Sequence, residues 1–155
     1  MIDPVANEGY AMFVVIVSCL SLVFGTTVLH YEILRALNAG LPTLRIHSRL
    51  KLLVVILSAF FAHAVEIALY GAAFYGLVDH LSAGHVDGTA KFSLTTCMYF
   101  SAENFTSLGF GDLTPIGPVR LLVGVEALNG LLLIGWSASF TYIAMQQFWL
   151  RDPER

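Results

Sequence analysis

Long apolar runs separated by short polar connectors make up most of this chain. The first run, residues 10–29, has twenty positions and no charged residue. About 20 residues rising ~1.5 Å each cross the ~30 Å hydrocarbon core of a bilayer, so this run predicts a spanning helix. The preceding nine residues carry Asp3 and Glu8 but no Lys or Arg, which disfavours a cleaved signal peptide. The helical spacing continues through Leu37 until Gly40 and Pro42 supply a stop signal.

Two further apolar runs are long enough to cross a bilayer. One covers residues 48–78 and is interrupted by His63 and Glu66, and the other covers residues 119–150 and is interrupted by Glu126. Between them lie a polar connector, residues 77–91, and a helix-like stretch, residues 92–105. Fourteen residues cannot span as a helix, so this stretch is expected to be re-entrant. The pattern predicts an all-α membrane protein with three transmembrane helices plus one re-entrant helix.

Composition agrees with this interpretation and narrows the class. The chain is 57% hydrophobic and 12% charged, with a mean hydropathy of +0.74, which is too apolar for an ordinary soluble domain of its length. Its net charge of -3 offers no basic surface for nucleic acid. Cys19 and Cys97 lie in apolar stretches without metal-ligand spacing or a disulfide framework, so we expect them to be packing residues.

The basic residues predict an orientation. The connector between the first two runs and the tail hold six of them: Arg35, Arg45, Arg49, Lys51, Arg151 and Arg155. The opposite side has Lys91 and Arg120. Because short cytoplasmic loops are enriched in Lys and Arg, the amino terminus and the re-entrant region are expected outside and the tail inside, in a plasma (inner) membrane.

The loop T-S-L-G-F-G-D, residues 106–112, follows the re-entrant stretch directly. Irregular backbone at membrane depth is tolerated where protein buries it or where it lines a water-filled path. Gly109 and Gly111 alternate with apolar residues, and glycine can adopt the left-handed conformations that let successive carbonyls point one way. Such carbonyls can replace the water shell of a cation.

The string S-A-E-N-F-T-S-L-G-F-G-D-L-T-P resembles the pore helix and selectivity filter of the potassium-channel family. The resemblance covers residues 48–150, leaving residues 1–47 as an extra helix with its connector and 151–155 as a cytoplasmic tail. It implies a tetrameric pore, a homotetramer of this chain in the lipid bilayer, with potassium as the permeant ion and no other cofactor. The implied ion-coordinating residues are Ser107, Leu108, Gly109 and Phe110, supported by Thr106, Gly111, Asp112 and Glu103.

The loop departs from the family filter T-V-G-Y-G at three places. Leu108 offers only its carbonyl to an ion, so that change should be tolerated. Phe110 lacks a phenol that would bond to residues behind the filter, which predicts weaker bracing. Ser107 keeps the hydroxyl but loses the stiff β-branched rotamer, so its site is expected to be looser and Ser107→Thr to leave selectivity equal or sharper.

Glu103 precedes Asp112 by nine residues and, by the resemblance, lies behind the filter. Two carboxyls brought close rarely both ionise, so the pair is expected to share a proton and brace the loop. The alternative is that Glu103 bonds a backbone group at the helix end.

Gly130 and Asn129 lie within the last run. By the resemblance Gly130 is a candidate hinge, and close helix packing is the alternative. Asn129 either faces a water-filled cavity or bonds a neighbouring helix.

Three ionisable residues inside the spans, His63, Glu66 and Glu126, form a candidate intramembrane polar cluster. Such groups cost a few kcal/mol in a membrane and usually face protein or water. A hydrogen-bonded packing cluster is favoured over a proton-sensitive gating contact. A metal site is disfavoured, since the sequence shows no matching Cys or extra His at the same depth.

The connector also carries ionisable residues: Asp79, His80, His85 and Asp87. They are interpreted as a solvated loop rather than a divalent-ion site. The sequence shows no arrangement of a nucleophile, a base and an oxyanion hole, so we do not expect an enzyme.

The sequence therefore predicts a potassium-selective channel with passive conduction. A weakly selective monovalent cation channel is the first alternative, and it depends on Ser107. A non-conducting membrane subunit that acts by association through the first helix is the second.

Overall fold

The structure is a computed structural model that describes residues 4–88 and 91–150. The expected cytoplasmic tail, residues 151–155, lies outside the described residues.

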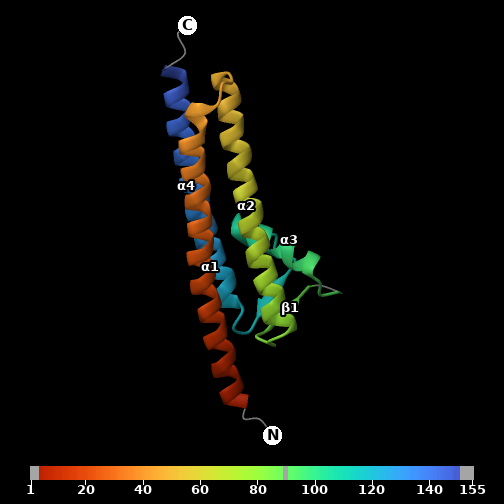
Figure 1. The fold of residues 1–155 in the computed structure, drawn as a ribbon. Coiled ribbons are helices and arrows are strands. Elements are labelled where there is room, and N and C mark those ends of the chain that lie inside the picture. The colour runs from red at the N-terminus through yellow and green to blue at the C-terminus, as the bar shows by residue number, and fades with distance from the viewer. Residues whose placement is uncertain (1–3, 89–90, 151–155) are drawn as a thin grey trace.

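Three long helices form the body of the molecule (Figure 1). They are α1 (Pro4–Gly40), α2 (Ser48–Asp79) and α4 (Arg120–Leu150), and a short 3-10 turn, η1 (Leu41–Thr43), follows α1. Within the described residues these three helices are long and apolar enough to cross a membrane. The prediction of an all-α membrane protein with three spanning helices is confirmed.

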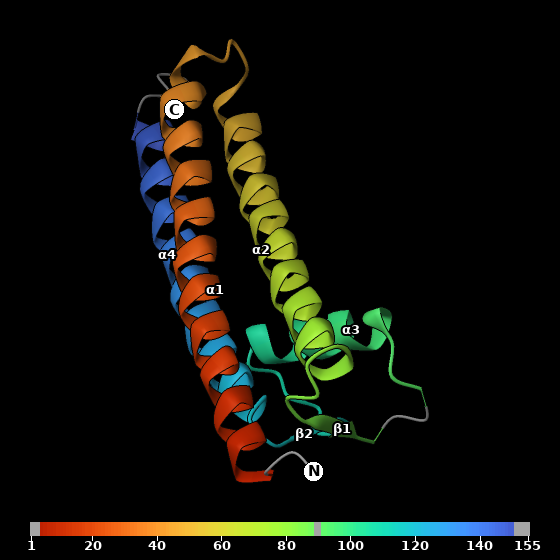
Figure 2. The same ribbon diagram turned by 60° about the horizontal axis from the view of Figure 1, so that its bottom comes forward.

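The helices run in alternating directions, which places the connections at two ends (Figure 2). The start of α1 lies at the same end as the segment between α2 and α4. The α1–α2 connector and the end of α4 lie at the other. This arrangement agrees with three crossings, because the loops fall alternately on each side.

A short helix, α3 (Leu94–Phe105), runs at a steep angle to α2 and extends sideways from the long helices, in the half of the molecule that holds β1 (Figure 1). It begins two residues later than the apolar pattern indicates, because Ser93 is its N-cap and accepts a hydrogen bond from the Thr96 amide. Its twelve residues reach ~18 Å, so α3 enters the molecule without crossing it.

A small antiparallel sheet, absent from the sequence prediction, has one strand before α3 and one strand after the glycine loop. Strand β1 (His85–Asp87) pairs with β2 (Thr114–Ile116), with Val86 opposite Pro115. The pairing joins the connector before α3 to the chain after the glycine loop. It fixes where that loop ends.

The core lies between α3 and the long helices. Its largest fully buried side chains include Tyr70, Phe74, Phe105 and Leu122. Cys19 and Cys97 are both free and buried, and burial raises the pKa of the Cys97 thiol to about 11. An undissociated buried thiol packs as a small apolar side chain.

Candidate functional site

The loop after α3 is exposed along residues 106–112, including the side chains of Leu108 and Phe110. Every second residue has a left-handed backbone: φ is 56° at Ser107, 52° at Gly109 and 78° at Gly111. Glycine adopts such angles without steric cost, whereas other residues pay for them. Residues 107–111 lie between α3 and β2 and take no part in the β1–β2 pairing.

The backbone of Ser107, directly after the C-cap residue Thr106, takes part in the hydrogen bonds that end α3. Its amide donates to the carbonyl of Asn104 at 2.9 Å, and the Leu108 amide donates to the carbonyl of Glu103 at 2.9 Å. These two bonds form a Schellman motif with Ser107 at the left-handed position that glycine usually occupies. The helix therefore stops where the loop begins, and the backbone of Ser107 is set by the cap.

Two glycines let α3 sit close to the long helices. A Cβ on Gly71 of α2 would lie 2.9 Å from Met98 Sδ and 3.1 Å from Met98 Cα. A Cβ on Gly130 of α4 would lie 2.8 Å from the carbonyl carbon of Phe105 and still closer to its oxygen. Real Cβ atoms do not approach backbone as closely as at Gly130, so that contact requires glycine, whereas at Gly71 a Cβ would fit only if the Met98 side chain and nearby backbone shifted slightly. The two contacts hold α3, and with it the start of the loop, between α2 and α4.

Tyr99 connects the two carboxylates expected to share a proton. Its hydroxyl donates to Asp112 Oδ2 at 3.2 Å, and its hydrogen bond with Glu103 is the main cause that raises the phenol pKa to about 12. Glu103 is buried, and its Oε1 has no hydrogen-bond partner among the described residues. The brace in this structure therefore runs from Glu103 through a phenol to Asp112. Tyr99 and Glu103 are four residues apart on α3, and this spacing could have indicated the contact.

We expect Tyr99→Phe to weaken the bracing of the loop, because the substitution removes the hydroxyl that donates to Asp112 and keeps the ring. Since the folded pKa lies above the ordinary value near 10, the phenol stays protonated and the brace persists below pH 10. It is lost as the pH rises toward 12. Thermal unfolding from pH 6 to 11, compared between the two proteins, checks this. A difference that appears or disappears between pH 6 and 9 would contradict it.

Gly130 and Asn129 both face neighbouring helices. The Asn129 amide donates to Thr26 Oγ1 of α1 at 2.8 Å and to Tyr70 Oη of α2 at 3.1 Å, and its side chain is buried. For Asn129 the structure thus favours the alternative of a bond to a neighbouring helix. We call Thr26, Tyr70 and Asn129 the amide junction.

His63 and Glu66 lie together, and a residue from α1 joins them. His63 Nδ1 lies 2.8 Å from Glu66 Oε2, and His30 Nδ1 lies 2.8 Å from Glu66 Oε1. We call these three residues the histidine–carboxylate cluster. His30 Nε2 lies 3.1 Å from Ser137 Oγ of α4, so the cluster links all three long helices. The sequence prediction missed His30, which directly follows the apolar run 10–29 and lies 36 positions from Glu66 along the chain.

Glu126 is buried, but its hydrogen-bond partner is neither His63 nor Glu66. It forms a hydrogen bond with Ser101 of α3, whose hydroxyl also donates to the carbonyl of Ile67 at 2.8 Å. Of the three predicted cluster residues, two therefore meet each other and one ties α4 to α3. The difference arises because α3 lies between α2 and α4 at that height and offers a hydroxyl.

The profile of the family described as "Ion channel" matches residues 52–147, which is more than half of the chain. This chain belongs to the ion-channel family. The match begins within α2 and ends within α4, so it contains α3 and the loop. The expected family is confirmed, and α1 lies outside the match.

The sequence of this ion-channel family member is also similar to part of a curated protein. It is the inward rectifier potassium channel Kirbac3.1 of Paramagnetospirillum magnetotacticum, 38% identical over 65 residues. That stretch covers 41% of this chain and 22% of the relative, so the chain matches about a fifth of the relative's length. No solved structure matches.

The connector of the channel-family chain has weakly paired, exposed histidines. His80 Nδ1 lies 3.3 Å from Asp79 Oδ2, and His85 Nε2 lies 3.6 Å from Asp87 Oδ1. Within each pair the two residues lie one or two positions apart in sequence, and every side chain is more than a third exposed. This agrees with a solvated loop.

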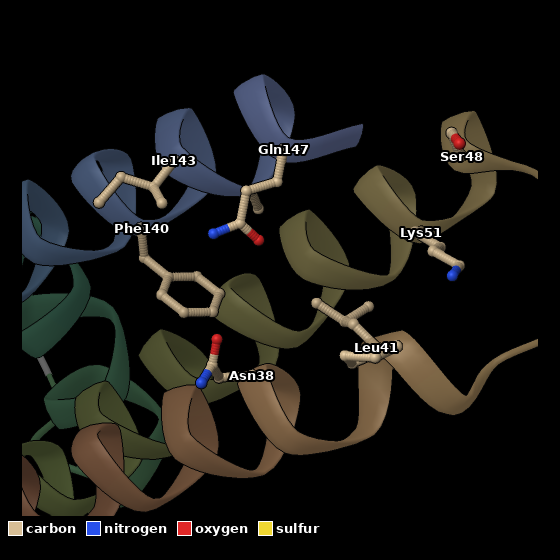
Figure 3. Close-up of a pocket in the computed structure, with 9 residues that line it drawn as sticks. Asn38, Leu41, Ser48, Lys51, Phe140, Ile143 and Gln147 are labelled. Carbon is tan, nitrogen blue, oxygen red and sulfur yellow. The ribbon is translucent and has the colours of Figure 1, made fainter. Parts of the chain in front are cut away.

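A pocket of about 190 Å³ lies at the opposite end of the bundle (Figure 3). Asn38 of α1, Phe140 of α4 and Gln147 of α4 converge on it, as Figure 3 shows. It lies beside the α1–α2 connector, far along the helices from α3 and the loop. It therefore plays no part in the candidate site.

Proposed function

We propose that the protein is a potassium-selective channel that conducts passively through a homotetrameric pore. The observation that carries the proposal is the alternation of left-handed residues at 107, 109 and 111 in an exposed loop. Alternating handedness turns successive carbonyls toward one side, and a row of carbonyls is what replaces the hydration shell of potassium. The ion-coordinating carbonyls are those of Ser107, Leu108, Gly109 and Phe110.

The position of α3 adds to this argument. The carbonyl end of a helix carries a partial negative charge, and the last residue of α3 directly precedes the loop. Its twelve residues are held against α2 and α4 by Gly71 and Gly130. The dipole therefore favours a cation at the inner end of the loop.

One chain provides one wall of the path, so several copies are needed to enclose an ion. The side chains of Leu108 and Phe110 are about 60% and 65% exposed in the single chain. Apolar residues of α4 are also exposed, including Leu128 and Leu132. Four copies would cover part of this surface and close a ring of carbonyls. The loop end then faces outside and the end of α4 faces the cytoplasm, as the Arg and Lys distribution indicates.

Flux through purified protein in liposomes tests the proposal. A potassium gradient and a sodium gradient are compared, with barium added as a filter blocker. Potassium-selective, barium-sensitive flux is expected. Equal flux of both ions would favour the weakly selective channel, and absence of flux in a folded tetramer would overturn conduction and favour the non-conducting subunit.

Exchanging the side chain of Ser107 tests its role in the filter. Thr stands at this position in the family filter T-V-G-Y-G, so we expect Ser107→Thr to leave the selectivity for potassium over sodium equal or sharper. Ser107→Gly suits the left-handed φ of 56° and keeps the helix cap but removes the hydroxyl, so it should lower that selectivity. The ratio of potassium to sodium flux in the three proteins checks this, and a clear loss of selectivity in Ser107→Thr would contradict it.

A further inference from the structure

We propose that His30, His63 and Glu66 form a binding site for a divalent transition metal ion, with Zn²⁺ as the representative ion. The three side chains offer two imidazole nitrogens and a carboxylate from α1 and α2. Their ligand atoms all lie within 4.8 Å of one another. His30 and Glu66 are fully buried, and the His63 side chain is 17% exposed.

The donor set selects the class of metal. Imidazole nitrogen suits zinc, copper, iron and nickel, whereas magnesium and calcium prefer oxygen ligands. Two histidines and a glutamate are a known set of protein ligands for zinc, with a fourth position left for water or an anion. Because Glu66 supplies one negative charge, an anion in the fourth position would neutralise the metal.

The geometry requires only small adjustments. Each imidazole Nδ1 already lies 2.8 Å from its own oxygen of Glu66. Bonds of about 2.0–2.2 Å to a tetrahedral metal place neighbouring ligand atoms roughly 3.3–3.5 Å apart. The two rings are stacked with centroids 5.2 Å apart, so both nitrogens approach the carboxylate from neighbouring directions. A metal between the side chains would therefore lengthen each of these nitrogen–oxygen distances from 2.8 Å by about 0.5–0.7 Å, which side-chain rotation can supply without a new backbone.

The second ring nitrogen of His30 is held by a hydrogen bond to α4. Its Nε2 lies 3.1 Å from Ser137 Oγ on α4. Metal-binding histidines usually have the other ring nitrogen bonded, and losing that bond costs 10–100-fold in metal affinity. Ser137 therefore acts as a positioning residue, and the metal would join α1 to α2 directly and to α4 through a hydrogen bond.

The competing interpretation is a hydrogen-bonded cluster that holds the helices without a metal. Two imidazole N–H groups can satisfy both carboxylate oxygens, and zinc would then change nothing. A spectroscopic titration separates the two, and it does not depend on conduction, so its failure is distinct from failure of the proposed function.

Purified wild-type protein is stripped with chelator and titrated with Co²⁺, followed by its visible absorption. We expect one Co²⁺ per chain with the intense bands of a four-coordinate site, displaced by Zn²⁺. His30→Ala, His63→Ala and Glu66→Gln should each lose the bands, and Ser137→Ala should bind about tenfold or more weakly. The double variant His80→Ala/His85→Ala, in the exposed connector, should bind like wild type.

Absence of the bands in the wild-type protein would overturn the proposal, as would bands that persist in folded His30→Ala or disappear in the connector variant. Where a cluster variant fails to fold, X-ray absorption of the zinc-loaded wild-type protein decides. Scattering from two imidazoles supports the site, and its absence refutes it.

Discussion

Gly130→Ala is expected to destabilise the protein and to remove most of its ion flux. The added Cβ would meet the backbone of Phe105, 2.8 Å from its carbonyl carbon and 3.0 Å from its Cα. Backbone at the end of α3 cannot turn aside as a flexible side chain can, so α3 and the following loop must shift. Overpacking of this kind costs about 1–3 kcal/mol per chain. Thermal unfolding in detergent and potassium flux in liposomes measure the two effects.

Gly124→Ala and Gly135→Ala are matched controls on the same helix, since nothing lies within 4 Å of a Cβ at either position. Both should unfold at the wild-type temperature or slightly above it, because alanine favours a helix. The comparison also separates packing from a hinge at Gly130. If Gly130 were a hinge, Gly130→Ala would reduce ion flux and leave the unfolding temperature unchanged, and that result would contradict the packing explanation.

Gly109→Ala and Gly111→Ala are expected to reduce potassium flux at least tenfold while leaving the unfolding temperature near that of wild type. The φ angles of 52° and 78° cost an alanine about 1–2 kcal/mol each, so four copies around one pore raise the cost to ~4–8 kcal/mol. The surroundings are open, since nothing lies within 4 Å of a Cβ at either glycine. The loop should relax to an ordinary backbone, which turns its carbonyls away from the ion.

Leu108→Ala is the matched control for these two variants. It changes an exposed side chain and leaves the backbone carbonyl in place. Flux should remain close to wild type. If Gly109→Ala and Gly111→Ala conducted as well as Leu108→Ala, the loop would not be the conducting element.

The sequence predicts an element well where a single property, such as the length of an apolar run, determines its structure. The bounds of α2 and α4 follow from the length of the apolar runs, because a bilayer requires about 20 such residues. The short α3 follows from the same length rule. The loop was located because two closely spaced glycines and an acid are unusual beside apolar helices.

Contacts between distant segments were harder to predict. The β1–β2 pairing involves three residues per strand and a proline, and neither strand shows an alternating pattern long enough to recognise. His30 meets Glu66 across 36 positions, and only the packing of α1 against α2 brings them together. The contact between Tyr99 and Glu103 can be predicted from the sequence, since their spacing of four residues places both on one face of α3.

The polar contacts of α1 bear on how the chain is assembled during synthesis. Helix α1 precedes its partners, so it enters the bilayer before Glu66 and Asn129 are available. Thr26 satisfies its own hydroxyl through the carbonyl of Leu22 at 2.7 Å. His30 forms its hydrogen bonds with Glu66 of α2 and Ser137 of α4, so these bonds form only after both helices are in place. Insertion of α2 and α4 beside α1 should therefore complete the bundle, with α1 acting as the template on which the channel-family part is assembled.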